Sequence, residues 1–244
     1  FVTIDEIKDL KGKLPKGTYA LTYGNLPWAF MSLLYGAGGT LENDMDDLTK
    51  DVWRKPMEKL KEAYDAGVIA PMDVDGEQAF GSGKAVFAQL GTWAQGNMSN
   101  TLGADKIAEA NTLQYSADNP VNFFYQCNWM QLKDPHRSAA KSAAAADFVK
   151  YVYEHWMDWS EVGSISPAYR DLNNPEYQKL IQASFTNSKK ERDYIKTSNY
   201  LYGGYATAGW GTYNDIVYGN VGLEEGLKTL DLMAQGQIEI QEES

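Results

Sequence analysis

Short runs of β-forming residues alternate along this chain with longer segments in which apolar side chains recur at helical spacing. Thr18 to Tyr23 and Lys84 to Gln89 are runs of the first kind, and a glycine follows each of them closely. The segment from Pro56 to Gly67 is of the second kind, with apolar residues on one face before a glycine suited to a helix end. This interleaving predicts an α/β or mixed fold.

Composition and charge exclude several classes of partner. Of the 244 residues, 43% are hydrophobic and 23% are charged, which is typical of a soluble globular protein. The net charge of -11 repels nucleic acid and anionic lipid, so we expect neither as a partner. Cys127 is the only cysteine, and His136 and His155 are the only histidines. We therefore expect no disulfide, no metal site and no cofactor.

Several helix and strand signals set the expected order of elements. Thr3 and Glu6 form a capping box, and Pro27 suits the first position of a second helix. Residues 111–132 predict a hairpin or two strands, and 175–184 predict a helix. A long helix is expected to start at Asp134-Pro135. Its apolar face would carry Ala145, Phe148, Val149, Val152 and Trp156.

The motifs that carry enzyme chemistry are incomplete. Gly81 to Lys84 resembles a phosphate loop, but Ala85 follows the lysine where the motif requires Ser or Thr. Glu42 and Asp44 are a carboxylate pair of the kind that glycoside hydrolysis needs across a cleft, but on a polar turn a solvated surface is the better interpretation. We therefore expect a protein that is not an enzyme. A carbohydrate-active enzyme remains the lesser alternative.

The aromatic residues suggest a binding function. The chain contains 7 Trp and 16 Tyr, and several lie near glycines rather than in apolar runs. An indole or phenol ring packs on the C–H face of a pyranose while amides and acids take its hydroxyls. Core packing is the alternative for each aromatic candidate, and a plain turn is the alternative for the single amide. The predicted ligand-binding residues are Trp93, Trp210, Trp28, Tyr213, Asn25 and Trp129.

The order of these segments resembles that of a known family. Ala79 to Phe87, followed by Gly91-Thr92-Trp93, resembles a hallmark of family 1 extracellular solute-binding proteins. In that family a helix ends in Phe-x-x-Gly-Lys, a strand crosses, and Gly-x-Trp presents the tryptophan to a sugar. Ala139 to Tyr151 is similar to the family's Ala-Ala-x-x-Phe-x-x-Tyr helix, and Trp210 to Tyr213 is similar to its late aromatic segment.

The resemblance implies a fold and a function. The fold would be the α/β, two-lobed, periplasmic-binding-protein-like type II fold, with mostly the second lobe present. Residues 1–108 and 164–244 would form that lobe, and 109–163 would belong to a first lobe whose N-terminal part is missing. The protein would bind a sugar or oligosaccharide between the lobes and deliver it to the permease subunits of an ABC importer. It would be an extracytoplasmic protein, either periplasmic or a lipoprotein at the cell surface, and a monomer when complete.

Two departures from the family pattern have consequences. Leu26 stands where maltodextrin binders carry an acid, so the sugar need not be a maltodextrin, and a non-sugar solute remains an alternative. Without the rest of the first lobe, the apolar faces of Val121 to Leu132 and Phe148 to Trp156 would have little to cover them. We therefore expect aggregation, a rearranged pairing, or a missing fragment supplied in trans.

Overall fold

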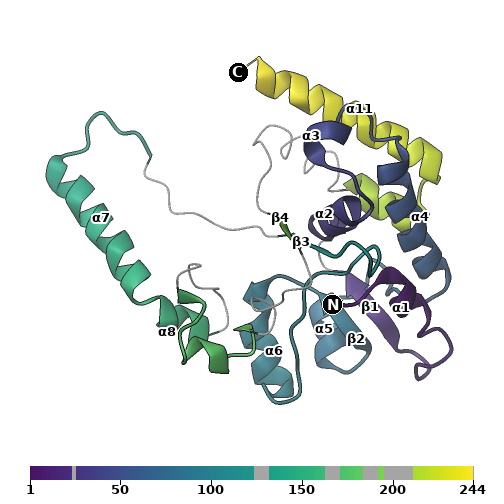
Figure 1. Ribbon diagram of the computed structural model, residues 1–244, viewed down its shortest axis with the longest axis horizontal. Helices are drawn as coiled ribbons and strands as arrows, with labels where there is room; N and C mark the ends of the chain where they lie inside the picture. Colours follow the sequence, from purple (N-terminus) through teal and green to yellow (C-terminus); the bar gives the residue numbers. More distant parts are fainter. Residues whose placement is uncertain (24–25, 124–131, 163–170, 184–191, 195–210, 244) are drawn as a thin grey trace. The chain divides into compact units, whose positions relative to one another are not determined.

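The computed structural model describes residues 1–23, 26–123, 132–162, 171–183, 192–194 and 211–243 (Figure 1). The chain divides into two compact units, which are described separately here. The larger unit comprises Phe1–Leu90, Ala110–Phe124 and Ser188–Ser244. The smaller unit comprises Gly91–Glu109 and Tyr125–Asn187.

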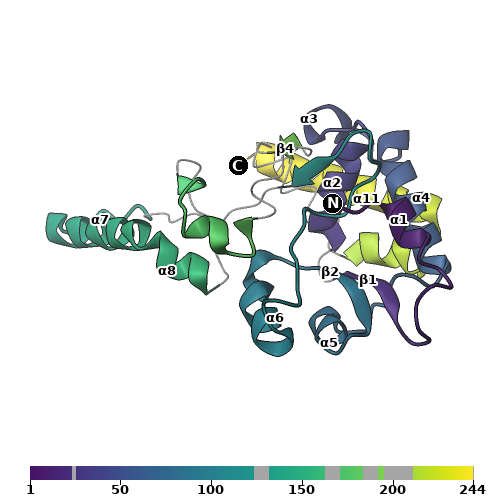
Figure 2. The same cartoon turned by 60° about the horizontal axis from the view of Figure 1, so that its bottom comes forward.

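Two parallel strands form one two-stranded sheet of the larger unit. β1 (Tyr19–Tyr23) pairs with β2 (Ala85–Gln89), and the register places Tyr23 opposite Gln89. A parallel pair needs a long crossover, which here contains several helices and ends in α5 (Gly76–Gly81). α5 lies against β2 in both ribbon views (Figures 1 and 2). Both strands that the β-forming runs predicted are confirmed.

Helices enclose a continuous core in the larger unit. They are α1 (Ile4–Lys8), α2 (Leu26–Gly36), α3 (Leu41–Asp44), α4 (Asp51–Asp65), α11 (Leu223–Glu242) and a helical segment at 211–217. Phe30 stacks on Trp53 with ring centroids 6.0 Å apart and contacts Tyr213 at 4.9 Å. All three side chains are fully buried, so aromatic packing holds α2, α4 and the segment at 211–217 together.

Local signals in the sequence explain where these helices begin and end. The Thr3 hydroxyl accepts the Glu6 amide at 3.2 Å, and the Glu6 carboxylate accepts the Thr3 amide at 2.8 Å, which completes the predicted capping box. Gly67 follows α4 with a φ of 76°, as a glycine at a helix end does. Pro56 lies buried inside α4, past its first turn.

A buried glutamine, Gln182, connects several helical elements of the smaller unit. Its elements are η1 (Thr92–Ala94), α6 (Gln95–Leu102), α7 (Ala139–Glu154), α8 (Trp156–Glu161) and η3 (Tyr177–Lys179). The Gln95 side-chain amide donates to the side-chain oxygen of Gln182 at 2.9 Å. The Gln182 side-chain amide donates to the Ser160 backbone carbonyl at 2.6 Å. These bonds join α6, α8 and the segment after η3.

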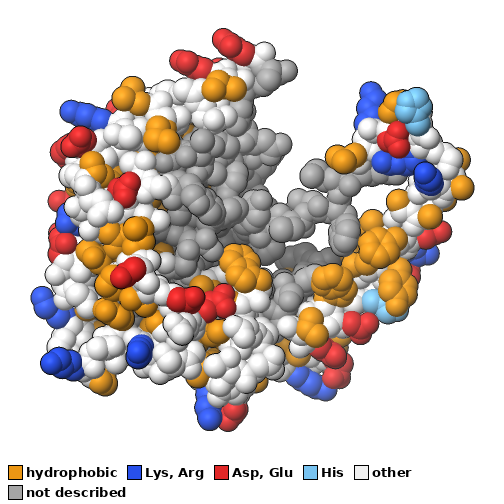
Figure 3. Space-filling model, turned by 180° about the vertical axis from the view of Figure 1, so that it is seen from behind, with side chains coloured by type: hydrophobic (Ala, Val, Ile, Leu, Met, Phe, Trp, Pro, Cys, Tyr) orange, Lys and Arg blue, Asp and Glu red, His pale blue; other side chains and the backbone are white. Residues whose placement is uncertain are grey.

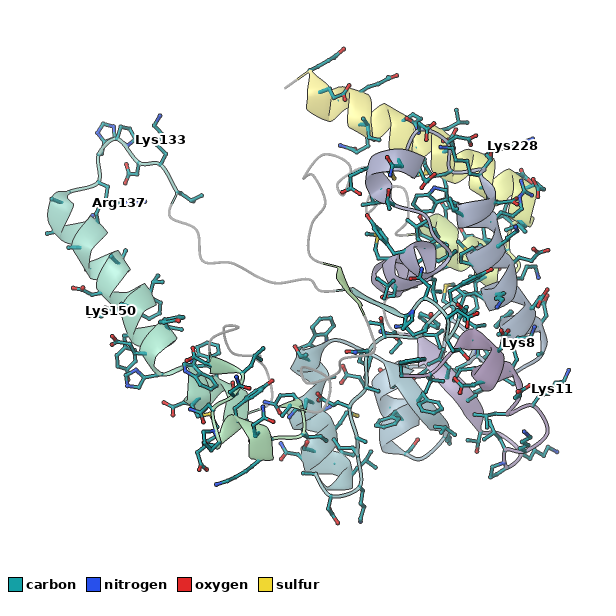
Figure 4. All side chains as sticks on the ribbon, in the orientation of Figure 1. Lys8, Lys11, Lys133, Arg137, Lys150 and Lys228 are labelled. Carbon is teal, nitrogen blue, oxygen red and sulfur yellow. The ribbon has the colours of Figure 1, made fainter. Side chains whose placement is uncertain are left out.

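Helix α7 carries no buried residue. Phe148 is 53% exposed and Tyr151 is 59% exposed, and hydrophobic side chains lie at the surface along this segment (Figure 3). Lys150 projects from the same helix and lies 3.7 Å from Glu154 (Figure 4). The expected lack of cover is found at Phe148, Val149, Tyr151 and Tyr153, whereas the expectation is wrong for Val121, which is 1% exposed. A face of this kind favours association over solubility.

Three expected elements differ in the structure. α7 begins at Ala139 behind the cap Ser138, whose hydroxyl accepts the Lys141 amide, and not at Pro135. Of the hairpin or two strands expected in 111–132, the second run contains β3 (Val121–Phe123), which pairs in parallel with β4 (Arg192–Tyr194). In the first run Gln114 forms an isolated bridge to Thr3, and residues 124–131 lie outside the described residues. A run of β-forming residues does not identify a partner that is distant in sequence.

In place of the helix predicted for 175–184, the structure has the short η3 and turns over 175–182, and residue 184 lies outside the described residues. The Asn174 side-chain oxygen accepts the amides of Glu176 and Tyr177 at 2.9 and 3.3 Å. Such local bonds compete with the helical pattern at its start. Among the described helices, none combines the length and the apolar character that crossing a membrane requires.

Candidate functional site

Among the predicted ligand-binding residues whose side chains the structure describes, Trp93 lies at the surface. It is 63% exposed and sits in η1, four residues after the end of β2. Gly91 precedes η1 in an extended conformation, and the Gly91 carbonyl accepts the Ala94 amide at 3.0 Å. A large, exposed indole on a short ordered turn suits a site that binds a flat apolar surface.

The backbone under Trp93 is held by buried polar contacts. Gln95 opens α6 two residues further on, and its side-chain amide donates to Gln182. Gln182 is 1% exposed and Ser160, which accepts from it, is 0% exposed. Because polar groups buried in this way are costly to disturb, the start of α6 has a fixed position within the smaller unit.

The carboxyl end of the strand pair is a second feature of interest. β1 and β2 end side by side at Tyr23 and Gln89. Asn25 follows the first strand by two residues, and Gly91 follows the second by two. In open α/β sheets, ligands bind outside the carboxyl ends of the strands. The segment that leads to Trp93 therefore begins just past the carboxyl end of β2, where the fold class places a ligand.

Two polar groups with perturbed environments, Tyr23 in the larger unit and Glu109 in the smaller unit, were not predicted from the sequence. The Tyr23 hydroxyl is buried without a hydrogen-bond partner among the described residues, and burial, with a smaller contribution from Tyr218, raises its pKa. Burial also raises the pKa of the Glu109 carboxyl to about 7. A lone Glu in a loop and a Tyr in a strand carry no sequence signal for such environments.

The structure places Tyr213 in the core. Its side chain is 0% exposed, it packs on Phe30, and burial raises the pKa of its hydroxyl well above the usual value. A side chain in this position offers no surface to a sugar. The spacing of Tyr213, Ile216 and Val217 along one helical face was the signal for a core position.

The remaining predicted residues stay predictions. Asn25, Trp129 and Trp210 lie outside the described residues. Trp28 lies within α2, but its side chain is outside the described part of the structure. Among the described residues, no group of three or more His, Cys, Asp or Glu side chains is placed to hold a metal ion.

The fold is that of the two-lobed solute-binding proteins. A cyclic α-maltosyl-1,6-maltose binding protein from Arthrobacter globiformis matches with a TM-score of 0.67 and 16% identity over 97% of this chain and 64% of its own. The MalE maltose/maltodextrin-binding domain from Bdellovibrio bacteriovorus, bound to maltotriose, matches with a TM-score of 0.71 and 16% identity over 96% of this chain and 66% of its own. The chain thus spans slightly less than two thirds of each similar structure.

A family model gives the more specific assignment. The model for bacterial extracellular solute-binding protein matches residues 2–186, and the chain belongs to that family. The predicted family and fold class are confirmed. The family is one of extracellular binding proteins, which agrees with the expected extracytoplasmic location. No curated protein matches the chain in sequence.

Proposed function

We propose that this chain is part of the substrate-binding component of an ABC importer and that it binds a sugar or oligosaccharide without forming a covalent bond. The observation that carries the proposal is the exposed indole of Trp93, presented directly after β2 in a chain of the solute-binding family. The maltotriose bound by one similar structure supports a carbohydrate as the ligand class.

The chemistry of a pyranose matches this arrangement. Its C–H face packs on an aromatic ring. The Trp93 indole is 63% exposed to water, and a sugar that covers it removes this apolar surface from water. The hydroxyls of the sugar need amide or acid partners, a role that we assign to Asn25. Trp28, Trp129 and Trp210 are the further proposed contacts.

The complete protein would act by closing around its ligand. We assign residues 1–108 and 164–244 to the second lobe and 109–163 to the first, and a hinge motion between lobes would present the loaded form to the permease subunits. In this proposal the protein works as a monomer in the periplasm or as a lipoprotein at the cell surface. No bond is made or broken at any step, so it has no catalytic residue.

Thermal unfolding of the chain against a panel of mono- and oligosaccharides tests the proposal. A ligand at about 100 times its Kd adds about 2.7 kcal/mol of stability. We expect at least one sugar to raise Tm, and Trp93→Ala to abolish the rise. Trp159→Ala is the matched control, because Trp159 is also an exposed tryptophan of the smaller unit, at 41%.

Three results would contradict the proposal. If no sugar raises Tm but an amino acid, peptide or polyamine does, the ligand class is wrong. If a sugar raises Tm equally in the wild type and in Trp93→Ala, the chain binds sugar but the site lies elsewhere. Hydrolysis of an aryl glycoside by the chain would instead favour a carbohydrate-active enzyme.

A further inference from the structure

The indole of Trp93 lies folded back over Gly91. A Cβ atom built on Gly91 would overlap Cζ3, Cε3 and Cη2 of Trp93, all of which belong to the six-membered ring of the indole. Real Cβ atoms do not approach other heavy atoms so closely. Any residue other than glycine at position 91 would therefore force the ring out of this position.

The backbone at position 91 does not itself require glycine. Gly91 has φ −87° and ψ 166°, an extended conformation that every residue adopts. Gly67 and Gly83 are the opposite case, because each has a positive φ and open space around its Cα. The need for glycine at position 91 thus comes from the side chain of Trp93 and not from the chain's own conformation.

The main chain at Gly91 lies close against the ring. Trp93 is 63% exposed, and among the described residues none stacks on the indole or hydrogen bonds to it. The turn beneath is fixed by the bond from the Ala94 amide to the Gly91 carbonyl. A ring that rests on an ordered backbone has lost part of its rotational freedom before a ligand arrives.

We propose that Gly91 is a positioning residue for ligand binding: by lacking a side chain, it lets the Trp93 indole rest against the main chain in the orientation that receives the sugar. This proposal rests on the function proposed above. It adds that the pose of Trp93, and not only its presence, determines affinity, and that this pose is set two residues away by a group that need not touch the ligand.

The test compares Gly91→Ala, Trp93→Ala and the double variant, with Gly236→Ala as the matched control. Gly236 lies in α11 with open space around it and no positive φ, so an added methyl group meets nothing there. Each protein is labelled with 5-fluorotryptophan, and the ¹⁹F resonance of Trp93 is assigned as the one that Trp93→Phe removes from the 7 in the wild type. Each is then titrated with the sugar panel, beginning with maltotriose.

We expect Gly91→Ala to shift the Trp93 resonance in the absence of sugar and to leave the other resonances in place. Sugar affinity should fall about tenfold or more, since a tryptophan that a bound ligand covers commonly contributes that much. In the Trp93→Ala background, Gly91→Ala should have no further effect on affinity. Gly236→Ala should change neither readout.

The outcomes separate this inference from the proposed function. An unchanged Trp93 resonance in Gly91→Ala overturns the positioning role whatever the sugars do. An equal loss of affinity in the presence and absence of Trp93 also overturns it, because Gly91 would then act by another route. If the resonance shifts but Trp93→Ala binds sugar like the wild type, Gly91 does position the indole, and the assignment of Trp93 to the sugar site fails instead.

Discussion

Helices α4 and α7 have nearly the same length, 15 and 16 residues, and both show apolar side chains at helical spacing in the sequence. In the larger unit, α4 buries five residues, whereas α7 in the smaller unit buries none. The difference teaches that periodicity predicts a helix and its apolar face but not whether another element covers that face. The cover is a property of the rest of the polypeptide.

The largest expected effect lies in the buried face of α4. Trp53 is 0% exposed, stacks on Phe30, and donates its indole N–H to the Asp44 backbone carbonyl at 2.8 Å. We expect Trp53→Ala to lower the free energy of unfolding by about 3–5 kcal/mol, through lost burial and an unsatisfied carbonyl. Urea unfolding followed by circular dichroism measures this. A loss similar to that of Phe148→Ala in α7 would remove the distinction between the two helices.

A smaller effect is expected from the polar centre of the smaller unit. Gln182→Ala removes the acceptor of the Gln95 side-chain amide and one of the donors to the Ser160 carbonyl, which also accepts the Val162 amide. Each unsatisfied buried group costs about 1–3 kcal/mol. Hydrogen exchange should show weaker protection in α6 and α8. We expect α4 in the larger unit to keep its protection. An equal loss of protection in α4, α6 and α8 would show that the two units unfold as one.

The capping box of α1 predicts a modest pH dependence. Hydrogen bonds from the Thr3 backbone and then from the Thr3 hydroxyl lower the pKa of Glu6 below its usual 4.5. A lowered pKa means that the ionised form stabilises the folded state, so the contribution is present at neutral pH and is lost as the pH falls below about 4.5. Glu6 is solvent-exposed, which limits the effect to a fraction of the cap's value.

Glu6→Gln tests this pH dependence. The variant should lose less stability than the wild type as the pH falls from about 6 to about 3, a range that brackets the titration of the Glu6 carboxyl. Thr3→Ala should cost about 1 kcal/mol at neutral pH, because it removes an N-cap. If the acid-induced loss in Glu6→Gln equals that in the wild type, the cap does not contribute to it.

The fold was more predictable from the sequence than the site. β1, β2 and the capping box follow from local composition, because neighbouring residues determine them. The parallel pairing of β3 with β4 joins residues about 70 positions apart, and no local pattern encodes it. Trp93 and Tyr213 both lie near glycines, yet one is 63% exposed and the other 0%. Their packing partners decide that difference.

The smallest expected change in stability concerns the exposed face of α7. Phe148 is 53% exposed and Val149 is 38% exposed, so Phe148→Ser should change the free energy of unfolding by no more than about 0.5 kcal/mol. Its effect should appear in solubility, because an exposed apolar face drives association. Sedimentation velocity at rising concentration should show less self-association for this variant than for the wild type. Lys150→Ser on the same helix is the control, since its side chain is already polar and 71% exposed. A stability loss of several kcal/mol in Phe148→Ser would show instead that α7 is covered in solution, and the contrast with α4 would then disappear.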